Sequence, residues 1–393
     1  MKQAIILAAG EGQRLRPFTA TKPKVMLSIA GKPILQYVVE SLAQNGIRNI
    51  VLVVGYKKEQ VFDHMGAGAQ FGVDITYVTQ KKQLGTFHAL IQAKTAAENS
   101  FLVLQGDKLI DADTIAHFTT TKPTALQVKS MANPLRYDIV TIKNGLVAGI
   151  GMADRPDQER GNIVNAGIYA FTTEIFNFTE PELDIPDVLN KMIAQGYPIT
   201  AKEVDGTWLD IAYPWDILSL NEAVLRQIPE NLGGTIETGV SLKGTVSVGK
   251  NTVIRSNSYI VGPVVIGDNC DIGPNVCILP ATSIGDNVVI LPFSEMSNSV
   301  IGNDVSIGPS CVIENSVIDR GCAIKGRLTA ASSQTEIKVN NEHHLINIGA
   351  MLGEGCNLSS CVVAQPGVIL GNHSQVQALK LISGRLPDRS LVF

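Results

Sequence analysis

The chain has 393 residues, which at roughly 150 residues per domain is enough for two or three domains with separate cores. Its 32 Lys and Arg residues against 36 Asp and Glu residues give a formal charge of -4, which excludes a global basic field that would hold nucleic acid or an anionic membrane. Hydrophobic residues make up 45% and charged residues 17% of the chain, as in ordered globular proteins, and no apolar run reaches the length of a membrane span.

The first apolar stretch, Ala4 to Ala8, is short and runs into Glu11 and Arg14 without a cleavage pattern, so it predicts a buried strand of a cytoplasmic protein. Apolar runs then alternate with amphipathic stretches. This alternation predicts an α/β domain in which helices connect the strands of a mixed, mostly parallel sheet. Helices are predicted to begin at Pro33 and Pro214, and strands to cover residues 4–8, 49–54, 75–79, 101–104, 125–128, 139–142, 166–171 and 199–204.

Beyond a linker at residues 229–234, β-branched aliphatic residues recur every six positions. The series includes Val248, Ile254, Ile260, Ile266, Ile272, Ile278, Ile284 and Ile290. Such a hexapeptide period predicts a parallel β-helix, in which Gly, Asn and Asp supply the turns that need positive φ. We therefore expect one domain over residues 1–228 and a C-terminal left-handed parallel β-helix over 229–393, with its repeat interrupted near 326–347.

The densest group of candidate functional residues follows the first strand. Glycines at positions 10 and 12 form a loop whose N–H groups can surround a phosphate, and Arg14, Arg16, Lys22 and Lys24 bring cations to it. The loop lacks the Gly-Lys-Ser/Thr ending of a Walker loop. It predicts a triphosphate site, although a solvated basic loop has the same composition.

Several segments in order along the chain extend this pattern. Leu7–Met26, Gln80–Thr86, Gln105–Asp107, Asn165–Tyr169 and Trp208–Ile211 together resemble the signature of the sugar-1-phosphate nucleotidyltransferases, the NDP-sugar pyrophosphorylases. With the β-helix, the layout is similar to archaeal two-domain enzymes related to glucose-1-phosphate thymidylyltransferase and to bifunctional UDP-N-acetylglucosamine pyrophosphorylase. The resemblance implies a Rossmann-like nucleotidyltransferase domain followed by the β-helix, and it covers nearly the whole chain.

The resemblance also implies catalytic roles. Asp107 and Asp210 would bind Mg²⁺, which prefers hard carboxylate ligands and retains several waters. Arg14 would hold the triphosphate and stabilise the leaving pyrophosphate, while Lys24 would reach the α-phosphate and the sugar phosphate. Without the resemblance, Asp107 would be read as a turn former, because an aspartate at the end of a strand more often has that role.

The remaining site residues implied by the resemblance bind the two substrates. Nucleotide contacts are expected from Leu7, Ala9, Gly10, Gly12, Gln80, Gln83, Gly85 and Thr86, an arrangement that in this family reads uracil or thymine. Sugar-phosphate contacts are expected from Asp154, Arg155 and Asn165. Two positions depart from the family pattern: Asp154-Arg155-Pro156 replaces Glu-Lys-Pro, and Tyr137-Asp138 replaces Tyr-Gly, which places a carboxyl group where the sugar normally meets backbone.

In bifunctional relatives the β-helix is an acetyltransferase with a catalytic His, but the associated His-Leu-Ser/Thr-Tyr and Gly-Ala-Gly-Thr patterns do not occur in this sequence. The matching region reads as though one coil had been lost. His343 and His344, inside the interruption, could serve as a general base or be solvated loop residues. Alternatively the β-helix is an assembly domain, because such prisms usually form homotrimers.

The sequence thus predicts an enzyme that converts UTP or dTTP and glucose-1-phosphate or N-acetylglucosamine-1-phosphate to an NDP-sugar and pyrophosphate. Two alternatives stay open. The β-helix could add acetyl-CoA-dependent acetyl transfer, or the chain could be a non-catalytic regulatory subunit that binds sugar nucleotides. The retained set Arg14, Lys24, Asp107 and Asp210 favours the enzyme, because a sensor has no need of both metal carboxylates.

Overall fold

A computed structural model describes residues 1–131, 137–152, 162–178, 183–203, 206–339 and 342–393. The chain divides into two compact units. The first contains Met1–Glu11, Pro23–Met26 and Ile34–Asp210, and the second contains Gly12–Lys22, Leu27–Pro33 and Ile211–Phe393. The basic loop that follows the first strand is therefore split, because its residues 12–22 belong to the second unit.

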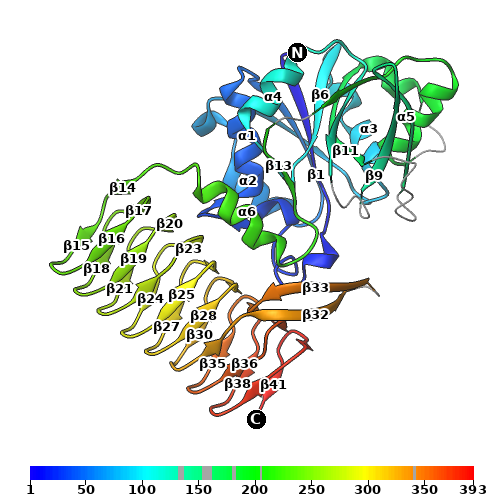
Figure 1. The fold of residues 1–393 in the computed structure, drawn as a ribbon. Helices are drawn as coiled ribbons and strands as arrows, with labels where there is room; N and C mark the ends of the chain where they lie inside the picture. Colours follow the sequence, from blue (N-terminus) through cyan, green and yellow to red (C-terminus); the bar gives the residue numbers. More distant parts are fainter. Residues whose placement is uncertain (132–136, 153–161, 179–182, 204–205, 340–341) are drawn as a thin grey trace. The chain divides into compact units, whose positions relative to one another are not determined.

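The first unit is built on a mixed sheet in the order β5-β4-β1-β6-β11-β8-β12-β10-β9 (Figure 1). Its strands are β1 (Gln3–Ala8), β4 (Asn49–Val54), β5 (Asp74–Thr79), β6 (Ser100–Gln105), β8 (Ala125–Ser130), β9 (Asp138–Lys143), β10 (Leu146–Met152), β11 (Ile163–Thr172) and β12 (Thr200–Glu203). Strands β5, β4, β1 and β6 are parallel, and β11 runs antiparallel to β6 and β8. The mixed α/β sheet expected from the sequence is confirmed.

Helices cover both faces of this sheet. They are α1 (Ile34–Gln44), α2 (Lys58–Met65), α3 (Thr86–Gln92), α4 (Ala112–Thr119) and α5 (Ile185–Ala194). Alternate residues of a strand point to opposite faces, so Ile6 packs with α1, α2 and α4, whereas Ile5 packs with α3 and α5. Two apolar cores result, and the carboxyl ends of β1 and β6 lie side by side between them because Leu7 pairs with Gln105.

Short elements complete the description. A two-stranded ladder joins β7 (Lys108–Ile110) to β13 (Trp208–Asp210), and another joins β2 (Ser28–Ile29) to β3 (Lys32–Pro33). Short 3-10 helices cover Gln13–Leu15, Lys24–Met26, Ala69–Phe71, Lys94–Ala96 and Thr173–Asn177. In the part of the chain that the structure describes, no helix combines the length and the apolar character that crossing a membrane requires.

The second unit contains α6 (Asp216–Leu225) and a stack of coils that forms three parallel sheets. The first sheet contains β14 (Asn231–Leu232), β17 (Val246–Val248), β20 (Val264–Ile266), β23 (Thr282–Ile284), β26 (Val300–Ile301), β29 (Val317–Ile318), β34 (Ala350–Leu352), β37 (Val368–Leu370) and β40 (Arg385–Leu386). The second contains β15 (Thr235–Ile236), β18 (Val253–Ile254), β21 (Asp271–Ile272), β24 (Val289–Ile290), β27 (Ser306–Ile307), β30 (Ala323–Ile324), β35 (Asn357–Leu358), β38 (Gln375–Val376) and β41 (Leu391–Val392). The third contains β16 (Ser241–Lys243), β19 (Tyr259–Val261), β22 (Cys277–Ile278), β25 (Glu295–Ser297), β28 (Val312–Glu314), β31 (Thr329–Ala330), β36 (Val363–Ala364) and β39 (Leu381–Ile382).

The aliphatic residues of the predicted repeat form the continuous core of this parallel β-helix. Corner residues such as Asn269 and Asp304 adopt the left-handed conformation, with φ of 57° and 59°, as the repeat predicts. The linker predicted at residues 229–234 is partly ordered, because β14 (Asn231–Leu232) within it already pairs with β17 of the stack.

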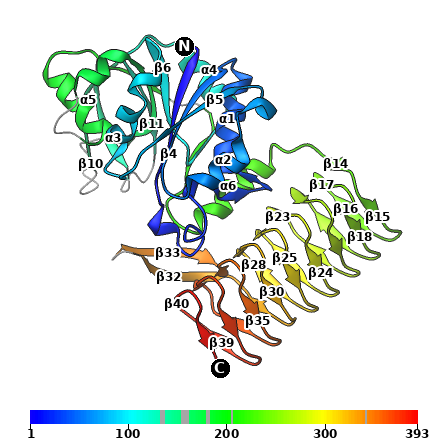
Figure 2. The same ribbon diagram turned by 180° about the vertical axis from the view of Figure 1, so that it is seen from behind.

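The interruption near residues 326–347 is an insertion. A hairpin of β32 (Ser333–Val339) and β33 (Glu342–Ile348) extends from the stack (Figure 2), and β29, β30 and β31 pair directly with β34, β35 and β36. The hairpin accounts for the interruption of the repeat that the sequence predicts near residues 326–347. The six-residue period is broken because the chain leaves the coil to form the hairpin and then returns.

Candidate functional site

A cavity of about 330 Å³ lies in the first unit where β1 and β6 end. Because the carboxyl ends of neighbouring parallel strands meet at the same sheet edge, the glycine loop after β1 and Asp107 after β6 come together there. The cavity is lined by Leu7, Ala9, Gly10, Gln80, Gln83, Gly85, Thr86, Ala89, Gln105, Asp107 and Asp184. Most of the residues expected to contact the nucleotide thus share one cavity.

Lys24 and Asp107 form an ion pair at this site. The Lys24 Nζ lies 2.5 Å from Oδ2 of Asp107, and the two side chains are 18% and 21% exposed. Burial alone raises the pKa of Asp107, but the charges of Lys24 and Lys108 outweigh it, so the pKa lies below its ordinary value. Asp107 is therefore an anionic carboxylate, as a metal ligand has to be.

The β7–β13 ladder brings Asp210 to the same place. Asp210 pairs with Lys108, the residue next to Asp107, although 103 positions separate Asp107 and Asp210 in the sequence (210 − 107). The Lys108 ammonium lies 4.6 Å from the ring centre of Trp208 and donates to the carbonyl oxygen of Ala166 at 3.1 Å. Two carboxylates and a buried lysine therefore converge, from segments that are distant in sequence.

The carboxylates suit Mg²⁺. Oδ1 of Asp107 is buried and accepts no hydrogen bond among the described residues, whereas Oδ2 faces Lys24. In the described part of the chain no cluster of three or more His, Cys, Asp or Glu residues offers a closed metal cage. A pair of carboxylates with room for water and substrate phosphates is the arrangement that Mg²⁺ prefers.

Lys108 is the residue that sequence reasoning left without a role. It is only 5% exposed, and burial lowers its pKa below the ordinary value. The negative charges of Asp210 and Asp107 act in the opposite direction and are outweighed. Its position directly after Asp107 was visible in the sequence, but its burial against Trp208 depends on long-range pairing.

The loop before α3 is held in a specific conformation. Gly85 has φ of 145°, and a Cβ there would lie 2.4 Å from the carbonyl oxygen of Leu183. The Asp184 carboxylate accepts from the backbone N–H and the hydroxyl of Thr86, at 2.8 and 3.0 Å. Only glycine fits this approach, so the loop that lines the cavity is anchored to the start of α5.

Gln80 is 3% exposed and supports the same loop. Its amide nitrogen donates to the carbonyl oxygen of Gly85 at 3.2 Å and to Nδ1 of His88 at 2.9 Å. Both amide donors are thus used within the protein. Gln80 is expected from the sequence to contact the nucleotide, and only its amide oxygen is left for that contact.

A second cavity of about 400 Å³ lies in the same unit. It is lined by Thr86, Gln105, Lys108, Tyr137, Asp138, Asn165, Gly167, Tyr169, Asp184, Pro186, Asp187 and Asp210. Asn165, the predicted sugar contact, donates to the Tyr169 hydroxyl at 2.9 Å and accepts from the Gly167 N–H at 2.8 Å. The side chain that lines the cavity is therefore rigidly held.

Asp138, which departs from the family pattern, lines this second cavity. Burial raises its pKa, although a hydrogen bond from Asn165 and the charge of Lys108 act in the opposite direction. The carboxyl group is therefore more easily protonated than a surface aspartate. Asp184, Asp187 and Tyr169 also line the cavity and were missed by sequence reasoning.

The remaining predicted residues are located elsewhere. Gly12 and Arg14 belong to the second unit, where Arg14 is exposed in the 3-10 helix Gln13–Leu15. Asp154 and Arg155, the expected sugar-phosphate contacts, lie outside the described residues.

The sequence profile of the nucleotidyl transferase family matches residues 3–227, and the bacterial transferase hexapeptide profile matches 245–280, 263–298 and 281–315. The chain is 32% identical over 408 residues to bifunctional protein GlmU of Methanococcus maripaludis, covering 99% of this chain and 97% of the relative. It is 30% identical over 393 residues to the bifunctional sugar-1-phosphate nucleotidylyltransferase/acetyltransferase of Sulfurisphaera tokodaii, covering 95% of each. A crystal structure of a Bacillus anthracis protein, assigned as a glucose-1-phosphate thymidylyltransferase, superposes with a TM-score of 0.52 and 27% identity over 58% of this chain and 97% of that one.

Proposed function

Because this chain belongs to the nucleotidyl transferase family and is a sugar-1-phosphate nucleotidyltransferase, we propose that it uses Mg²⁺ to convert UTP or dTTP and glucose-1-phosphate or N-acetylglucosamine-1-phosphate to an NDP-sugar and pyrophosphate. The observation that carries the proposal is the grouping of Lys24, Asp107 and Asp210 beside the two cavities. We place the reaction in the cytoplasm, where nucleoside triphosphates are available.

The two cavities suit the two substrates. The nucleotide occupies the cavity lined by the glycine loop after β1, with its base against the Gly85–Thr86 loop. The sugar occupies the cavity lined by Asn165 and Asp138. Asp107 borders the first cavity and Asp210 borders the second, so the phosphates of both substrates meet between these carboxylates.

In the reaction an oxygen of the sugar phosphate attacks the α-phosphorus in line, a new P–O bond forms, and the bond to the β-phosphate oxygen breaks with release of pyrophosphate. Mg²⁺ held by Asp107 and Asp210 would neutralise charge on the phosphates when bound. Lys24 stabilises charge on the α-phosphate and the sugar phosphate, and Arg14 does the same for the leaving pyrophosphate. The step needs no proton transfer, so positioning and charge stabilisation account for the catalysis.

A second activity, acetyl transfer by the β-helix, is favoured by the name of the Sulfurisphaera tokodaii relative. The candidate histidines lie in the β32–β33 hairpin, where Nδ1 of His343 lies 2.7 Å from Oε1 of Glu336. A Glu–His pair can act as a general base. The side chains of His343 and Glu336 are 57% and 64% exposed, as expected of a site that is completed by another subunit.

We also propose that the β-helix assembles as a homotrimer. Large apolar side chains are exposed on its coils, among them Tyr259, Val289, Leu291, Phe293, Val363, Leu379 and Leu381. Tyr259, Val363 and Leu381 lie in β19, β36 and β39 of the third sheet, and exposed apolar residues that recur along one sheet are typical of subunit interfaces. Light scattering coupled to size-exclusion chromatography distinguishes a trimer from a monomer.

The test of the main proposal is pyrophosphate release by the purified chain with each common NTP and dTTP, against glucose-, glucosamine-, N-acetylglucosamine- and mannose-1-phosphates. We expect release with UTP or dTTP, its loss with EDTA and its recovery with Mg²⁺. Acetyl-CoA consumption in a parallel series measures the second activity. A folded protein that binds an NDP-sugar and releases no pyrophosphate across the panel would instead be a regulatory subunit.

A further inference from the structure

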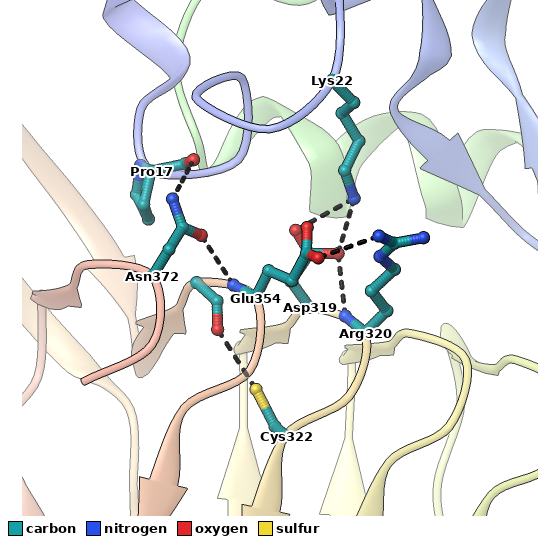
Figure 3. Close-up of polar contacts among 8 residues, drawn as sticks. Pro17, Lys22, Asp319, Arg320, Cys322, Glu354 and Asn372 are labelled. Atoms are coloured by element: carbon teal, nitrogen blue, oxygen red, sulfur yellow. Dashed lines mark hydrogen bonds and ion pairs between the residues drawn. The ribbon is translucent and has the colours of Figure 1, made fainter. Parts of the chain in front are cut away.

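Residues 12–22 of the nucleotide loop are held by the β-helix within the second unit (Figure 3). The Lys22 ammonium lies 2.7 Å from Oδ1 and 3.0 Å from Oδ2 of Asp319. The Asn372 amide donates to the carbonyl oxygen of Pro17 at 3.0 Å, and the Arg385 guanidinium donates to the carbonyl oxygen of Arg16 at 3.1 Å. Several coils of the β-helix therefore contact this segment.

Asp319 occupies an exceptional position in the stack. It follows the last residue of β29, and at the equivalent place in the other coils, up to β37, the residue is glycine. This column consists of Gly233, Gly249, Gly267, Gly285, Gly302, Asp319, Gly353 and Gly371. Among the coils from β14 to β37, Asp319 is thus the one residue of this column that carries a side chain.

The column is glycine for a steric reason. A Cβ at Gly267 would lie 2.4 Å from Oδ1 of Asp286, and one at Gly285 would lie 2.2 Å from Oδ1 of Asn303. These oxygens occupy the space because each accepts from a backbone N–H of the preceding coil, as Asp286 does from Asp268 at 2.8 Å. A residue with a side chain fits only where this ladder of capping bonds is broken.

The ladder is broken at Asp319. In the next coil the capping position is occupied by Glu354, whose carboxylate contacts the Arg320 guanidinium at 2.9 Å. Oδ1 of Asp319 accepts from the backbone N–H of Arg320 at 2.8 Å, and the same carboxylate receives both bonds from Lys22. The Asp319 carboxylate therefore replaces the cap that the next coil supplies elsewhere, and it also binds Lys22.

The ion pair is largely excluded from water, with the side chains of Lys22 and Asp319 only 16% and 11% exposed. A pair with this burial holds its partners in one geometry, and the loss of one partner leaves a poorly solvated charge. Lys22 is followed by Pro23, whose φ is restricted, and then by Lys24, which is paired with Asp107. Both ends of this short segment are thus fixed by carboxylates.

A separate contact concerns the segment after Asp210. The ring of His344, on the β32–β33 hairpin, lies 4.3 Å from the Tyr213 ring and 5.2 Å from the Trp215 ring, between ring centres. Tyr213 follows Asp210 by three positions (213 − 210). The second unit therefore has two such contacts: Asp319 with Lys22, close in sequence to Lys24, and His344 with Tyr213, close in sequence to Asp210. Of the two, the contact to Lys22 is an ion pair.

We propose that Asp319 is a positioning residue for nucleotidyl transfer: by binding Lys22 it orders the segment 12–22 that carries Arg14 and leads to Lys24. The proposal rests on the proposed function, because it assigns Arg14 and Lys24 to the triphosphate. The β-helix accordingly acts on nucleotide binding through this loop, in addition to a role in assembly or acetyl transfer. Asp319 touches no substrate, so its removal acts on nucleotide binding through the loop.

The test compares the full-length variants Asp319→Asn, Lys22→Met and the double variant in the pyrophosphate-release assay. We expect each single variant to raise KM for the NTP about tenfold to 100-fold, with a smaller change in KM for the sugar phosphate. The double variant is expected to be no worse than either single variant, because both remove the same contact. The charge-reversed pair Lys22→Asp with Asp319→Lys is expected to recover part of the affinity.

Asp286→Asn is the matched control. Asp286 caps a coil of the same sheet, and the equivalent residue one coil later is Asn303, so the substitution suits the stack and is expected to leave KM for the NTP unchanged. An NTP KM within twofold of wild type in both Asp319→Asn and Lys22→Met would overturn the proposal. So would independent, additive losses in the double variant.

Tryptic cleavage gives a readout that does not depend on activity. Within residues 12–22 trypsin can cut only after Arg14, because Arg16 and Lys22 precede prolines. We expect Asp319→Asn, and not Asp286→Asn, to accelerate cleavage between Arg14 and Leu15. Faster cleavage with an unchanged NTP KM would make Asp319 merely structural and reject the proposal. A wild-type chain that releases no pyrophosphate rejects the proposed function instead, and equal cleavage of the two variants would then also reject the ordering of the loop.

Discussion

The ammonium group of Lys24 and the carboxylate of Asp107, 2.5 Å apart, join the segment after the nucleotide loop to the end of β6. Lys24 directly follows Pro23, and Asp107 follows the buried strand β6. The backbone on the N-terminal side of each residue is therefore restricted. The contact leaves Oδ1 of Asp107 for a metal ion. In the proposed reaction one carboxylate would thus orient Lys24 and bind Mg²⁺ at the same time.

Asp107→Asn is therefore expected to lower kcat by at least about 100-fold, because it removes the proposed metal ligand and the partner of Lys24 in one step. The amide retains the shape of the side chain, so Tm is expected to change little. Initial rates of pyrophosphate release over a range of Mg²⁺ concentrations measure the effect, and the half-saturating Mg²⁺ concentration is expected to rise. A variant with unchanged kcat and unchanged Mg²⁺ dependence would remove Asp107 from the site.

Gly85→Ala is expected to raise KM for the NTP about tenfold or more, because the new Cβ would lie 2.4 Å from the carbonyl oxygen of Leu183 and force the loop out of the cavity. Gly149→Ala in β10 is the control, since no atom lies within 4 Å of its added Cβ. Steady-state kinetics with the NTP varied distinguish the two variants. Equal KM values would mean that the loop tolerates a different conformation.

Asp138 gives a prediction on pH. Because the folded state raises its pKa above the ordinary value of 3.8, the folded protein binds this proton more tightly than the unfolded chain does. Stability is therefore lost as pH rises from about 3.8 through the folded pKa. Asp138→Asn, which cannot ionise, is expected to raise Tm by about 1–3 °C at neutral pH, with the gain disappearing towards pH 4. A gain that is the same at both pH values would show that ionisation of the buried carboxyl group is not its cause.

The same position bears on the choice of sugar. Asp138→Gly restores the family's residue and removes a carboxyl group from the wall of the second cavity. We expect the ratio of kcat/KM between two sugar-1-phosphates to change by about tenfold, while KM for the NTP is constant. Kinetics with a panel of sugar-1-phosphates at saturating NTP give this ratio. Unchanged selectivity would place Asp138 outside sugar recognition.

The contacts of Asn221 in α6 lead to a prediction on the free energy of unfolding. Fully buried, it accepts from the Ala30 N–H and the Ser283 hydroxyl, at 3.1 and 2.7 Å, and donates to the carbonyl oxygen of Ala281 at 2.9 Å. Asn221→Ala leaves these buried groups unpaired and is expected to cost about 2–4 kcal/mol. Glu222→Ala, on the exposed side of the same helix, is expected to cost less than about 1 kcal/mol. Thermal and urea unfolding of both variants check the difference.

Periodicity predicted the larger elements, because a buried strand or a repeating coil leaves a local pattern of apolar residues. It failed for β10, where Gly149 and Gly151 interrupt the apolar alternation. At the interruption of the β-helix it showed only where the repeat stops, because a loss of period does not reveal the inserted β32–β33 hairpin. These errors arise where the local pattern is weakest.

The site was predictable to a different degree. Sequence motifs named most of the residues that line the first cavity, because the glycine loop and Asp107 each follow a recognisable apolar strand and the ends of neighbouring parallel strands meet at one sheet edge. The pairing of Asp210 with Lys108 depends on a ladder between distant segments, which no local pattern shows. The contact between Lys22 and Asp319 spans 297 positions, and only the break in the glycine column marks it in the sequence.

That separation has a consequence for the newly made chain. Lys22 is synthesised 297 residues before Asp319, which at about 5–20 residues per second is a delay of about 15–60 s. During this interval residues 12–22 have no coil on which to settle, even though β1, on their N-terminal side, is already available for pairing. The nucleotide loop therefore takes its final place only after most of the polypeptide has left the ribosome, and a chain truncated by premature termination before residue 319 would carry the signature residues without the carboxylate that holds them.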